Sequence, residues 1–497
     1  MHKVCLVLAH VFPPVNAVGV HRTVALCRHL VEQGWSVTVI TARPEEGANR
    51  DPRLAMRVPQ EVRIVRTPAP HLLRLLGRVL GRRHTSGRPH TSEAGALLAG
   101  HEPVRERRIR QIVEWLSLWL CVPDGYIGWF VPALWAGMRE ARRQRPHVIY
   151  STAPQWVGHL VAAALSRLLR VPWVADFRDP WHGNPWRLVM TEGSPAHRRA
   201  DAALERWAVH RAARVTCAVD GIRQLLAARY PQKAACIETV HNGFDPDLVD
   251  QIVPRRLGGD GCVLLHAGTL YGPRSPVPLL DGLKRLRAES PAEAALFRIV
   301  FVGLPTYNGR PLADFARERG IADLVEVILP VSYHEALAHI KGADVAVLFG
   351  QTGEGAIAPI PAKVYEYIRM GKAVLAIEAG EEALEVLRGG GCRAWQANGS
   401  DGGAFAVVLR DVLAAHRRGE LSPGAPNPAR LAFTRRHMAE RLASVLEESI
   451  TGPRRPVAGR MPVAGAAACA GAPGQTLARD GQARAGERSA VRSGGDA

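Results

Sequence analysis

The chain has 497 residues, of which 47% are hydrophobic and 22% are charged. It is long enough for two globular domains with sizeable cores, and its composition is ordinary for a soluble protein. The formal net charge is +18, and half of this excess lies in residues 71–114 and 451–497. We expect no binding of nucleic acid, because a charge run is usually a solvated face and no aromatic residues are interleaved with the basic ones.

The cysteines and the start of the chain favour a cytoplasmic location. The eight cysteines are scattered, without a CxxC pair or a close His partner. This pattern argues against a zinc site or a disulfide framework and favours a reducing compartment. Val4–Ala9 is too short for the apolar core of a secretory signal. No apolar run approaches the roughly 18 residues of a membrane-spanning helix.

The first forty residues read as strand, glycine-bearing loop, helix and strand. The strand Val4–Ala9 leads through the loop His10–Gly19 into an amphipathic helix at His21–Gln33, and the next strand is Ser36–Thr41. Such units repeat, which predicts a parallel sheet with right-handed crossovers. The later strands are expected at Val148–Ser151, Trp173–Asp176, Arg214–Ala218 and Ile237–Val240, with helices near Trp156–Leu169 and Pro195–Ala213.

A second series of alternating strands and helices begins after the Pro/Gly-rich break Pro254–Gly261. Two doubly wound α/β domains, residues 1–252 and 262–450, are therefore predicted, with the loops at the carboxyl ends of both sheets facing a central cleft. The strands of this series are expected at Val263–Gly268, Arg298–Gly303, Val325–Leu329, Val345–Phe349 and Ala373–Ile377.

Two segments are expected to lie outside these domains. Residues 78–108 are predicted to be a flexible basic insertion in the first domain. Residues 453–497 are rich in Gly, Ala, Pro and Arg and have almost no large apolar residues. Such a composition cannot bury enough apolar surface to fold, so we expect a disordered tail.

The segment Pro361–Ala376 has the pattern of a ligand-binding crossing from helix to strand. It places Glu366 in a helix that Gly371 ends, and an apolar strand follows. A Glu beside a loop of small residues can accept two ribose hydroxyls, while free N–H groups at the helix start face phosphate. A surface Glu on an amphipathic helix is the alternative interpretation.

This segment resembles the donor-site signature of retaining glycosyltransferases of family 4, which have the GT-B fold. In the signature a Glu is followed by seven residues and a second Glu, and Glu366 matches the second. The first falls on Ala358, so that carboxylate is absent, and Glu354 is a nearby substitute. The departure is similar to the divergent subgroup that builds bacterial surface polysaccharides and decorated metabolites.

Three further loops resemble the family in the expected order. The loop Phe12–Arg22 is similar to its opening loop, where Gly19 matches the small-residue turn at the donor diphosphate. Residues 178–181 read Arg-Asp-Pro-Trp, as in one subgroup, in place of the usual His-Asp pair. After the first strand of the second domain, Thr269 replaces an Arg of the family, whereas Arg274 preserves its second phosphate-holding cation.

The resemblance covers about residues 1–450 and implies a retaining transferase that moves a sugar from a nucleoside diphosphate to a hydroxyl acceptor, without a metal or a cofactor. His21 is also a candidate helix cap, and Asp176 and Asp179 with Arg178 are also candidates for an ion pair that staples the loop. The predicted residues are Gly19, Gly268, Arg274, Lys363 and Glu366 for the donor, Arg178, Asp179 and Arg274 for catalysis, and His21 and Asp176 on the acceptor side.

Two other classes stay open, a sugar-nucleotide-binding protein without turnover and a GT-B-like sugar-nucleotide epimerase. Ala358 and Thr269 are the departures that suggest them. Asn242-Gly243 resembles a turn of the family, and a tight turn with positive φ is expected there. Asp245-Pro246-Asp247 imitates a DxD metal motif, which we discount because no other ligand cluster accompanies it.

The acceptor is predicted only by class, as a saccharide, a lipid-linked molecule or a small metabolite. Trp115–Trp135 holds five Trp or Tyr residues and follows a basic cluster. Such a segment can lie on the inner face of an anionic membrane, although aromatics at helical spacing more often belong to a core. Peripheral membrane contact is therefore the minority expectation. The basic residues of this cluster are Arg105, Arg107, Arg108 and Arg110.

Overall fold

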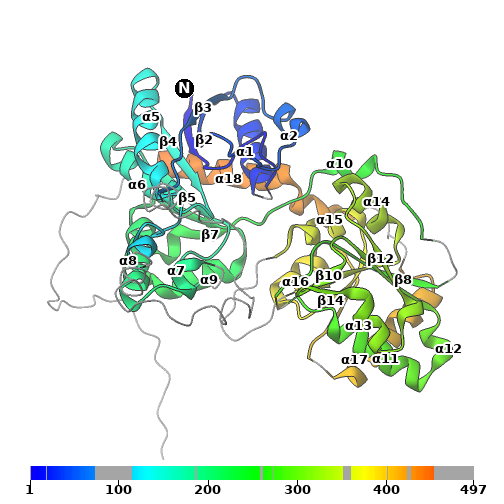
Figure 1. The fold of residues 1–497 in the computed structure, drawn as a ribbon. Coiled ribbons are helices and arrows are strands. Elements are labelled where there is room, and N and C mark those ends of the chain that lie inside the picture. The colour runs from blue at the N-terminus through cyan, green and yellow to red at the C-terminus, as the bar shows by residue number, and fades with distance from the viewer. Residues whose placement is uncertain are drawn as a thin grey trace, which may run out of the picture. The chain divides into compact units, whose positions relative to one another are not determined.

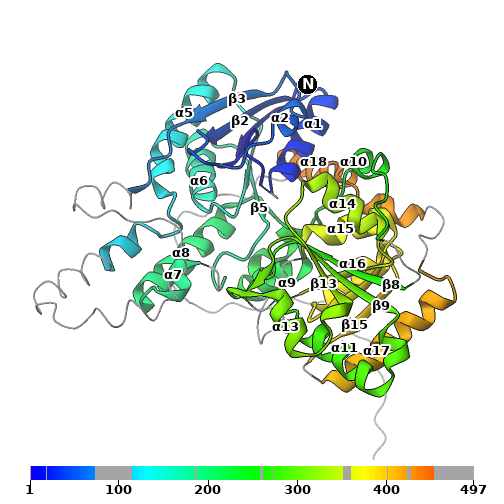
Figure 2. The ribbon, with the colours of Figure 1, turned by 45° about the vertical axis from the view of Figure 1, so that its right-hand side comes forward.

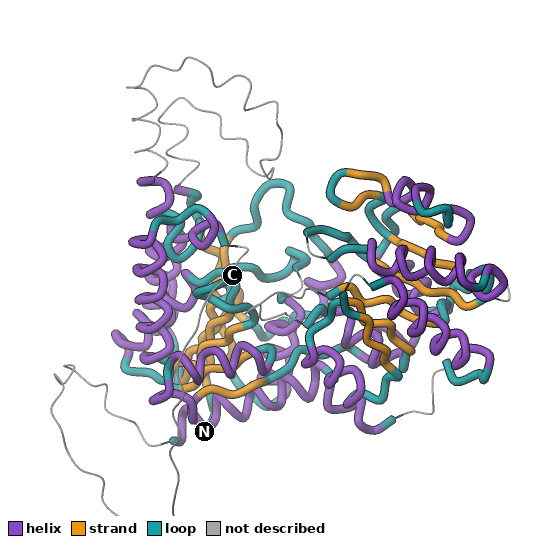
Figure 3. Tube along the Cα trace, turned by 90° about the horizontal axis from the view of Figure 1, so that it is seen from below, coloured by secondary structure: helices purple, strands orange, loops and turns teal. Residues whose placement is uncertain are grey.

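The strands form two parallel sheets of buried apolar residues. The structure is a computed structural model, and it describes residues 2–17, 19–72, 115–184, 187–257, 261–272, 274–350, 360–399, 401–421 and 427–452. Figure 3 shows the strands in two groups, each with helices packed on it. By their contacts residues 1–453 form one compact unit. The predicted insertion 78–108 and tail 453–497 lie outside the described residues.

The first sheet has the strand order β3-β2-β1-β4-β5-β6-β7, and every pairing in it is parallel. Its strands are β1 (Val4–Leu8), β2 (Ser36–Ala42), β3 (Arg63–Thr67), β4 (Val148–Thr152), β5 (Trp173–Phe177), β6 (Arg214–Cys217) and β7 (Ile237–Thr239). The helices of this part are α1 (Val20–Glu32), α2 (Pro52–Met56), α5 (Phe130–Arg143), α6 (Val157–Leu169), α7 (Leu188–Thr191), α8 (Pro195–Arg211), α9 (Asp220–Arg229) and α10 (Pro246–Asp250).

The second sheet has the order β12-β9-β8-β13-β14-β15 and is also parallel throughout. Its strands are β8 (Cys262–Ala267), β9 (Phe297–Val302), β12 (Val325–Ile328), β13 (Val345–Phe349), β14 (Ala373–Ile377) and β15 (Ala394–Ala397), and β10 (Thr306–Tyr307) and β11 (Arg310–Pro311) form a separate hairpin. The helices are α11 (Val277–Glu289), α12 (Pro291–Ala294), α13 (Leu312–Glu318), α14 (Tyr333–Gly342), α15 (Ala362–Met370), α16 (Glu381–Gly389), α17 (Gly402–Arg417) and α18 (Arg435–Thr451). In Figure 2, α11 and α17 lie side by side.

The central strands read as continuous apolar runs because helices cover both faces of a parallel sheet. All five residues of β1, β4, β13 and β14 are buried. Every strand expected from the sequence is present, whereas β3 and β15 were not expected. Both are edge strands with polar residues, Arg-Ile-Val-Arg-Thr and Ala-Trp-Gln-Ala, so they lack the apolar run that marks a central strand.

Helix α18 lies in the range predicted for the second domain but packs against the first sheet. It contacts α1, β4, β5 and β6, and Figure 1 shows it beside α1. Its buried Met438, Leu442 and Leu446 share a core with Cys5 and Val7 of β1. The chain therefore returns to the first sheet before the predicted boundary at residue 450.

The chain passes between the two sheets twice, near Phe244 and near Thr434, and hydrogen bonds join these two segments. The N–H of Phe244 donates to the carbonyl of Phe433 at 3.0 Å, and the N–H of Arg435 donates to the carbonyl of Phe244 at 2.8 Å. A Cβ at Gly243 would lie 2.6–2.7 Å from backbone atoms of residues 433–435. Gly243 is not among the glycines with positive φ, so the expected tight turn is wrong and the glycine serves this close backbone approach instead.

No helix in the part of the chain that the structure describes is both long and apolar enough to cross a membrane.

Candidate active site

The predicted donor residues gather where the direction of the second sheet reverses. The chain leaves β8 toward β9 and leaves β13 toward β14, so the switch point lies between β8 and β13. Ligands of doubly wound sheets bind outside the carboxyl ends of the strands at this point. Gly268 and Arg274 follow β8, and α15 follows β13. Residues 351–359, which include Glu354 and Ala358, lie outside the described residues.

Helix α15 presents two predicted donor residues on one side. It ends at Gly371, whose φ of 61° is left-handed, as the sequence predicts. Lys363 and Glu366 are three residues apart and therefore share a face. Val364 and Ile368 are buried in the core. Their burial fixes the rotation of the helix, so the side chains of Lys363 and Glu366 point away from the core.

Lys363 lies directly against the backbone after β8. A Cβ built on Gly268 would come within 2.5 Å of the Nζ of Lys363, so only glycine leaves room for the ammonium. Burial lowers the pKa of Lys363 to about 8, and the charge of Arg274 acts in the same direction. The guanidinium of Arg274 stacks 5.0 Å from the ring centroid of Tyr271 and donates to its hydroxyl at 3.1 Å. The ammonium of Lys363 thus lies against the glycine backbone after β8, and the charge of Arg274 reaches it.

Glu366 contacts residues that the sequence did not single out. Its carboxylate accepts a hydrogen bond of 2.5 Å from the hydroxyl of Tyr333, the first residue of α14. Burial raises the pKa of Glu366, while this hydrogen bond and the charges of Arg435 and Lys363 oppose the rise. Tyr333 and Arg435 are each the first residue of a helix that a Ser or Thr caps. In the sequence such a cap predicts the start of a helix, and it does not indicate a binding site.

A pocket beside Glu366 draws residues from both series of elements. Arg435 lies 3.8 Å from Asp245, which pairs with Arg57 at 2.6 Å. Asp245, the first Asp of the apparent DxD motif, therefore lies between two arginines. The pocket is lined by His21, Arg22, Asn242, Gly243, Phe244, Asp245, Val249, Tyr333, Ala362, Tyr365, Glu366, Arg435 and Met438.

His21 lines this pocket from the second position of α1. No side chain caps the helix start, so the capping role considered from the sequence is wrong. Burial, together with the charges of Arg435 and Arg57, lowers the pKa of His21 to about 4. The ring is therefore neutral near pH 7 and offers one donor and one acceptor to a ligand.

Arg178 and Gly19 meet at the start of α1. A Cβ on Gly19 would lie 0.8 Å from Nη1 of Arg178, so the guanidinium crosses the place of the missing side chain. Nε of Arg178 donates to the carbonyl of Ala153. Burial lowers the pKa of Arg178 and raises that of its neighbour Asp179, although their charges attract. A half-buried cation beside the free N–H groups of a helix start forms a place for an anion.

Asp176 is structural, and its predicted place on the acceptor side is wrong. It lies inside β5 and is fully buried. Arg22 donates to both of its oxygens at 3.0 and 2.9 Å, and the hydroxyls of Tyr150, Thr152 and Thr216 donate at 2.8, 3.1 and 2.7 Å. Burial raises its pKa, but Arg22 and these hydroxyls hold it below the usual value. The carboxylate has no free face for a substrate.

The loop that carries Arg178 and Asp179 is anchored by Trp181. This ring is fully buried, and its N–H donates to Asp201 at 2.9 Å. Arg187 donates to both oxygens of the same carboxylate at 2.9 and 2.8 Å. The Arg-Asp-Pro-Trp sequence thus ends in a buried residue that anchors the loop.

The aromatic segment Trp115–Trp135 divides between core and surface. Trp129 is fully buried and donates to the hydroxyl of Thr67 at 2.7 Å. Trp115 and Trp135 are exposed, at 46% and 63%. Membrane contact by this segment stays a prediction, and the preceding Arg cluster lies outside the described residues.

Two parallel doubly wound sheets with loops at their switch points define the GT-B fold. The crystal structure of Anabaena Alr3699/HepE in complex with UDP is similar, with a TM-score of 0.54 and 14% identity over 90% of this chain and all of that chain. The family model Glycosyltransferase Family 4 matches residues 96–248. This match supports the resemblance to glycosyltransferases of family 4 that the sequence pattern indicated.

Two relatives carry the name D-inositol 3-phosphate glycosyltransferase. The protein of Stackebrandtia nassauensis is 37% identical over 113 residues, which cover 21% of this chain and 26% of the relative. The protein of Geodermatophilus obscurus is 32% identical over 177 residues, which cover 34% of this chain and 37% of the relative. The matched segments thus span 26% and 37% of these relatives, well under half of their length.

Proposed function

We propose that this protein is a glycosyltransferase that moves a sugar from a nucleoside diphosphate to a hydroxyl acceptor. The observation that carries the proposal is that Lys363 lies against the backbone of Gly268 and within electrostatic reach of Arg274, with Glu366 on the same face of α15 as Lys363. A half-buried ammonium beside a second cation is costly unless an anion binds between them. A diphosphate supplies that anion, and its ribose then reaches Glu366.

The donor nucleotide is held from three sides. Lys363 and Arg274 neutralise the diphosphate, and the missing side chain of Gly268 lets a phosphate oxygen come close to the backbone. Glu366 accepts from the two ribose hydroxyls. Because Tyr333 occupies this carboxylate in the structure, donor binding requires Tyr333 to share it or to turn away. UDP is the first nucleotide to test, since the similar Anabaena protein was crystallised with it.

The reacting end of the donor points to the loops of the first sheet. Arg178, lying over the start of α1 at Gly19, faces the sugar or the outer phosphate. In the transfer the bond from the anomeric carbon to the phosphate oxygen breaks and a bond to the acceptor oxygen forms. The acceptor proton passes to the leaving phosphate, so no protein base is assigned. We propose retention of configuration on this basis, and no metal for the step, because three cations of the chain serve the leaving group.

Asp179 is assigned to the acceptor or the sugar hydroxyls. It is half-buried, lies two residues after β5 and has a raised pKa because of burial. A carboxylate in such a place orients hydroxyl groups by accepting their hydrogen bonds. The names of the relatives make a phosphorylated cyclitol one acceptor to test, beside saccharides and lipid-linked acceptors.

A second candidate function is binding of sugar nucleotides without transfer. It is favoured by Thr269, which stands where the family has an Arg at the phosphates, so this chain has one cation fewer for the leaving group. A GT-B-like epimerase is the third candidate. The fate of the donor separates the three, since a transferase makes a glycoside, an epimerase makes an isomeric sugar nucleotide, and a binding protein changes neither.

The test is incubation of the purified chain with a panel of nucleotide sugars, with and without acceptors, followed by proton NMR of the products. Formation of a glycoside with the anomeric configuration of the donor supports the proposal. Arg274→Ala should lower turnover by roughly 10–1000-fold. Arg393→Ala is the matched control, since Arg393 also stacks on an aromatic ring, that of Trp395 at 5.7 Å, but lies outside the site. Equal losses in both variants would contradict the role of Arg274.

A further inference from the structure

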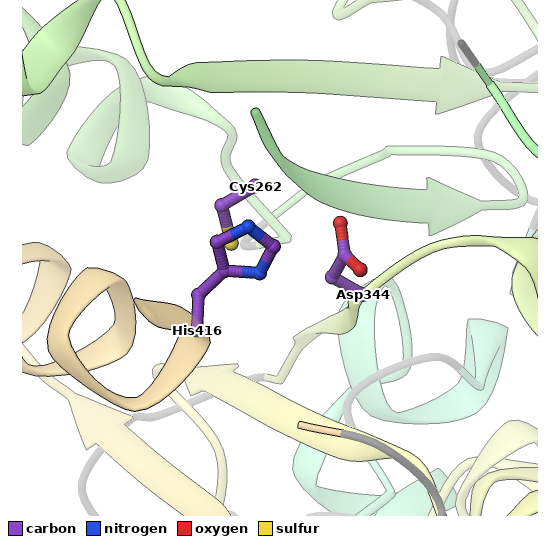
Figure 4. A group of neighbouring side chains, drawn as sticks. All are labelled: Cys262, Asp344 and His416. Atoms are coloured by element: carbon purple, nitrogen blue, oxygen red, sulfur yellow. The ribbon is translucent and has the colours of Figure 1, made fainter. Parts of the chain in front are cut away.

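Three side chains with metal-binding atoms meet at the amino ends of the central strands of the second sheet, whereas the donor site lies at the carboxyl ends. Cys262 is the first residue of β8, Asp344 directly precedes β13, and His416 lies in the last turn of α17. Their ligand atoms all lie within 4.8 Å of one another. Figure 4 shows the thiol, the carboxylate and the imidazole gathered around one space.

The contacts of these residues leave ligand atoms available. The N–H of Val263 donates to Oδ2 of Asp344 at 2.8 Å, which leaves Oδ1 for another partner. Within the described residues the imidazole of His416 forms no hydrogen bond. Cys262 is fully buried, whereas Asp344 and His416 are partly exposed. An ion can therefore reach the thiol past the carboxylate and the ring.

We propose that Cys262, Asp344 and His416 bind a zinc ion. Thiolate, imidazole and carboxylate are the ligands that Zn²⁺ takes, whereas Mg²⁺ and Ca²⁺ prefer oxygen alone. A thiolate and a carboxylate carry two negative charges, which balance the ion, and a water completes the tetrahedron. Tetrahedral zinc bonds place ligand atoms about 3.5 Å apart, so side-chain shifts of about 1 Å suffice to close the site.

The ion has a structural role and takes no part in transfer. Cys262 begins β8 and Gly268 directly follows its last residue, and a strand rise of about 3.3 Å per residue puts them about 20 Å apart. The site joins three elements that are far apart in the sequence, the starts of two central strands and the end of α17. Such a link stabilises the folded state, because the unfolded chain does not hold the three ligands together.

The test uses the full chain without a histidine tag, loaded with zinc, freed of excess ion by gel filtration and analysed for metal by mass spectrometry. We expect about one zinc ion per chain, as a three-ligand site with an open position requires. Cys262→Ser and His416→Gln should lose the ion, and Cys392→Ser, which changes another buried cysteine of the same sheet region, should keep it. Zinc should raise the melting temperature of the wild type and of Cys392→Ser. It should not raise that of Cys262→Ser or His416→Gln.

Cobalt substitution tests the ligands directly, even if a variant fails to fold. The wild-type chain loaded with Co²⁺ should show the charge-transfer band of a cobalt thiolate together with the visible bands of a tetrahedral ion. Asp344→Asn should weaken cobalt binding by at least about tenfold. A folded wild-type chain that retains no zinc and shows no thiolate band would overturn the proposal. So would zinc retained by both Cys262→Ser and His416→Gln.

Discussion

The guanidinium of Arg178 occupies the space that a side chain at residue 19 would fill. A Cβ on Gly19 would lie 0.8 Å from Nη1, 1.8 Å from Cζ and 2.3 Å from Nη2 of Arg178. Gly19 has a φ of −75°, which any residue adopts. The glycine is therefore required for the position of the arginine and not for the backbone.

Gly19→Ala should displace Arg178 and lower turnover by roughly 10–100-fold, because the cation leaves the reacting phosphate. Steady-state turnover and thermal melting measure the two effects separately. The control is Gly125→Ala, since a Cβ at Gly125 meets no atom within 4 Å. Full turnover in a folded Gly19→Ala chain would show that the contact between Gly19 and Arg178 does not serve transfer.

Lys363 should make donor binding depend on pH. Its pKa of about 8 means that the free protein loses this cation as the pH rises through 8, whereas a bound diphosphate holds the proton on. Affinity for a nucleotide sugar should therefore be constant below pH 7 and fall by up to about tenfold per pH unit above 8. The nucleotide sugar itself has no phosphate group that titrates in this range.

Calorimetric titration at several pH values checks this dependence. Lys363→Met should bind weakly at every pH, and Lys363→Arg, which keeps its charge, should lose the slope. A slope that persists in Lys363→Arg would assign the titration to another group.

Glu366→Gln should weaken binding of the nucleotide sugar by about 1–3 kcal/mol, the cost of losing hydrogen bonds to a charged acceptor. Calorimetry measures the change. Glu335→Gln is the control, because Glu335 is also a helical glutamate but caps α14 through Ser332, a role that Gln also fills. Unchanged affinity in a folded Glu366→Gln chain would remove Glu366 from the site.

Asp176→Asn should destabilise the fold by about 3–5 kcal/mol, because it leaves the buried charge of Arg22 without its partner. Denaturant unfolding measures the loss. Asp314→Asn, which breaks an exposed pair with Arg317, should cost at most about 1 kcal/mol. Since the pKa of Asp176 is lowered in the fold, its contribution is present above the unfolded pKa and is lost as the pH falls. A stable Asp176→Asn chain with lost turnover would restore the acceptor-side role.

The sequence predicted the central strands and the helix that carries Glu366 because both leave local patterns. Apolar runs mark buried parallel strands, and Glu366 with Gly371 marks a helix that ends in the left-handed region. The edge strands β3 and β15 lack such runs. The place of Asp176 was missed because its partner Arg22 lies 154 residues away, and no local pattern announces such a pair.

The residues around Glu366 were missed for the same reason. Tyr333 and Arg435 approach it from the starts of α14 and α18, and only the return of α18 to the first sheet brings Arg435 there. The scattered cysteines indicated no zinc site, yet the fold brings Cys262 to Asp344 and His416. Tertiary contacts between distant segments, and not local propensity, create these groups.

The most direct test of the account is calorimetric titration of the chain with UDP, GDP, ADP and dTDP. Binding of one of these nucleotides, weakened at least about tenfold by Lys363→Met and by Arg274→Ala but not by Arg393→Ala, is the predicted result. If none of the four binds to the folded wild-type chain, or if both variants bind as tightly as the wild type, the proposed donor site at Gly268, Lys363 and Arg274 is contradicted.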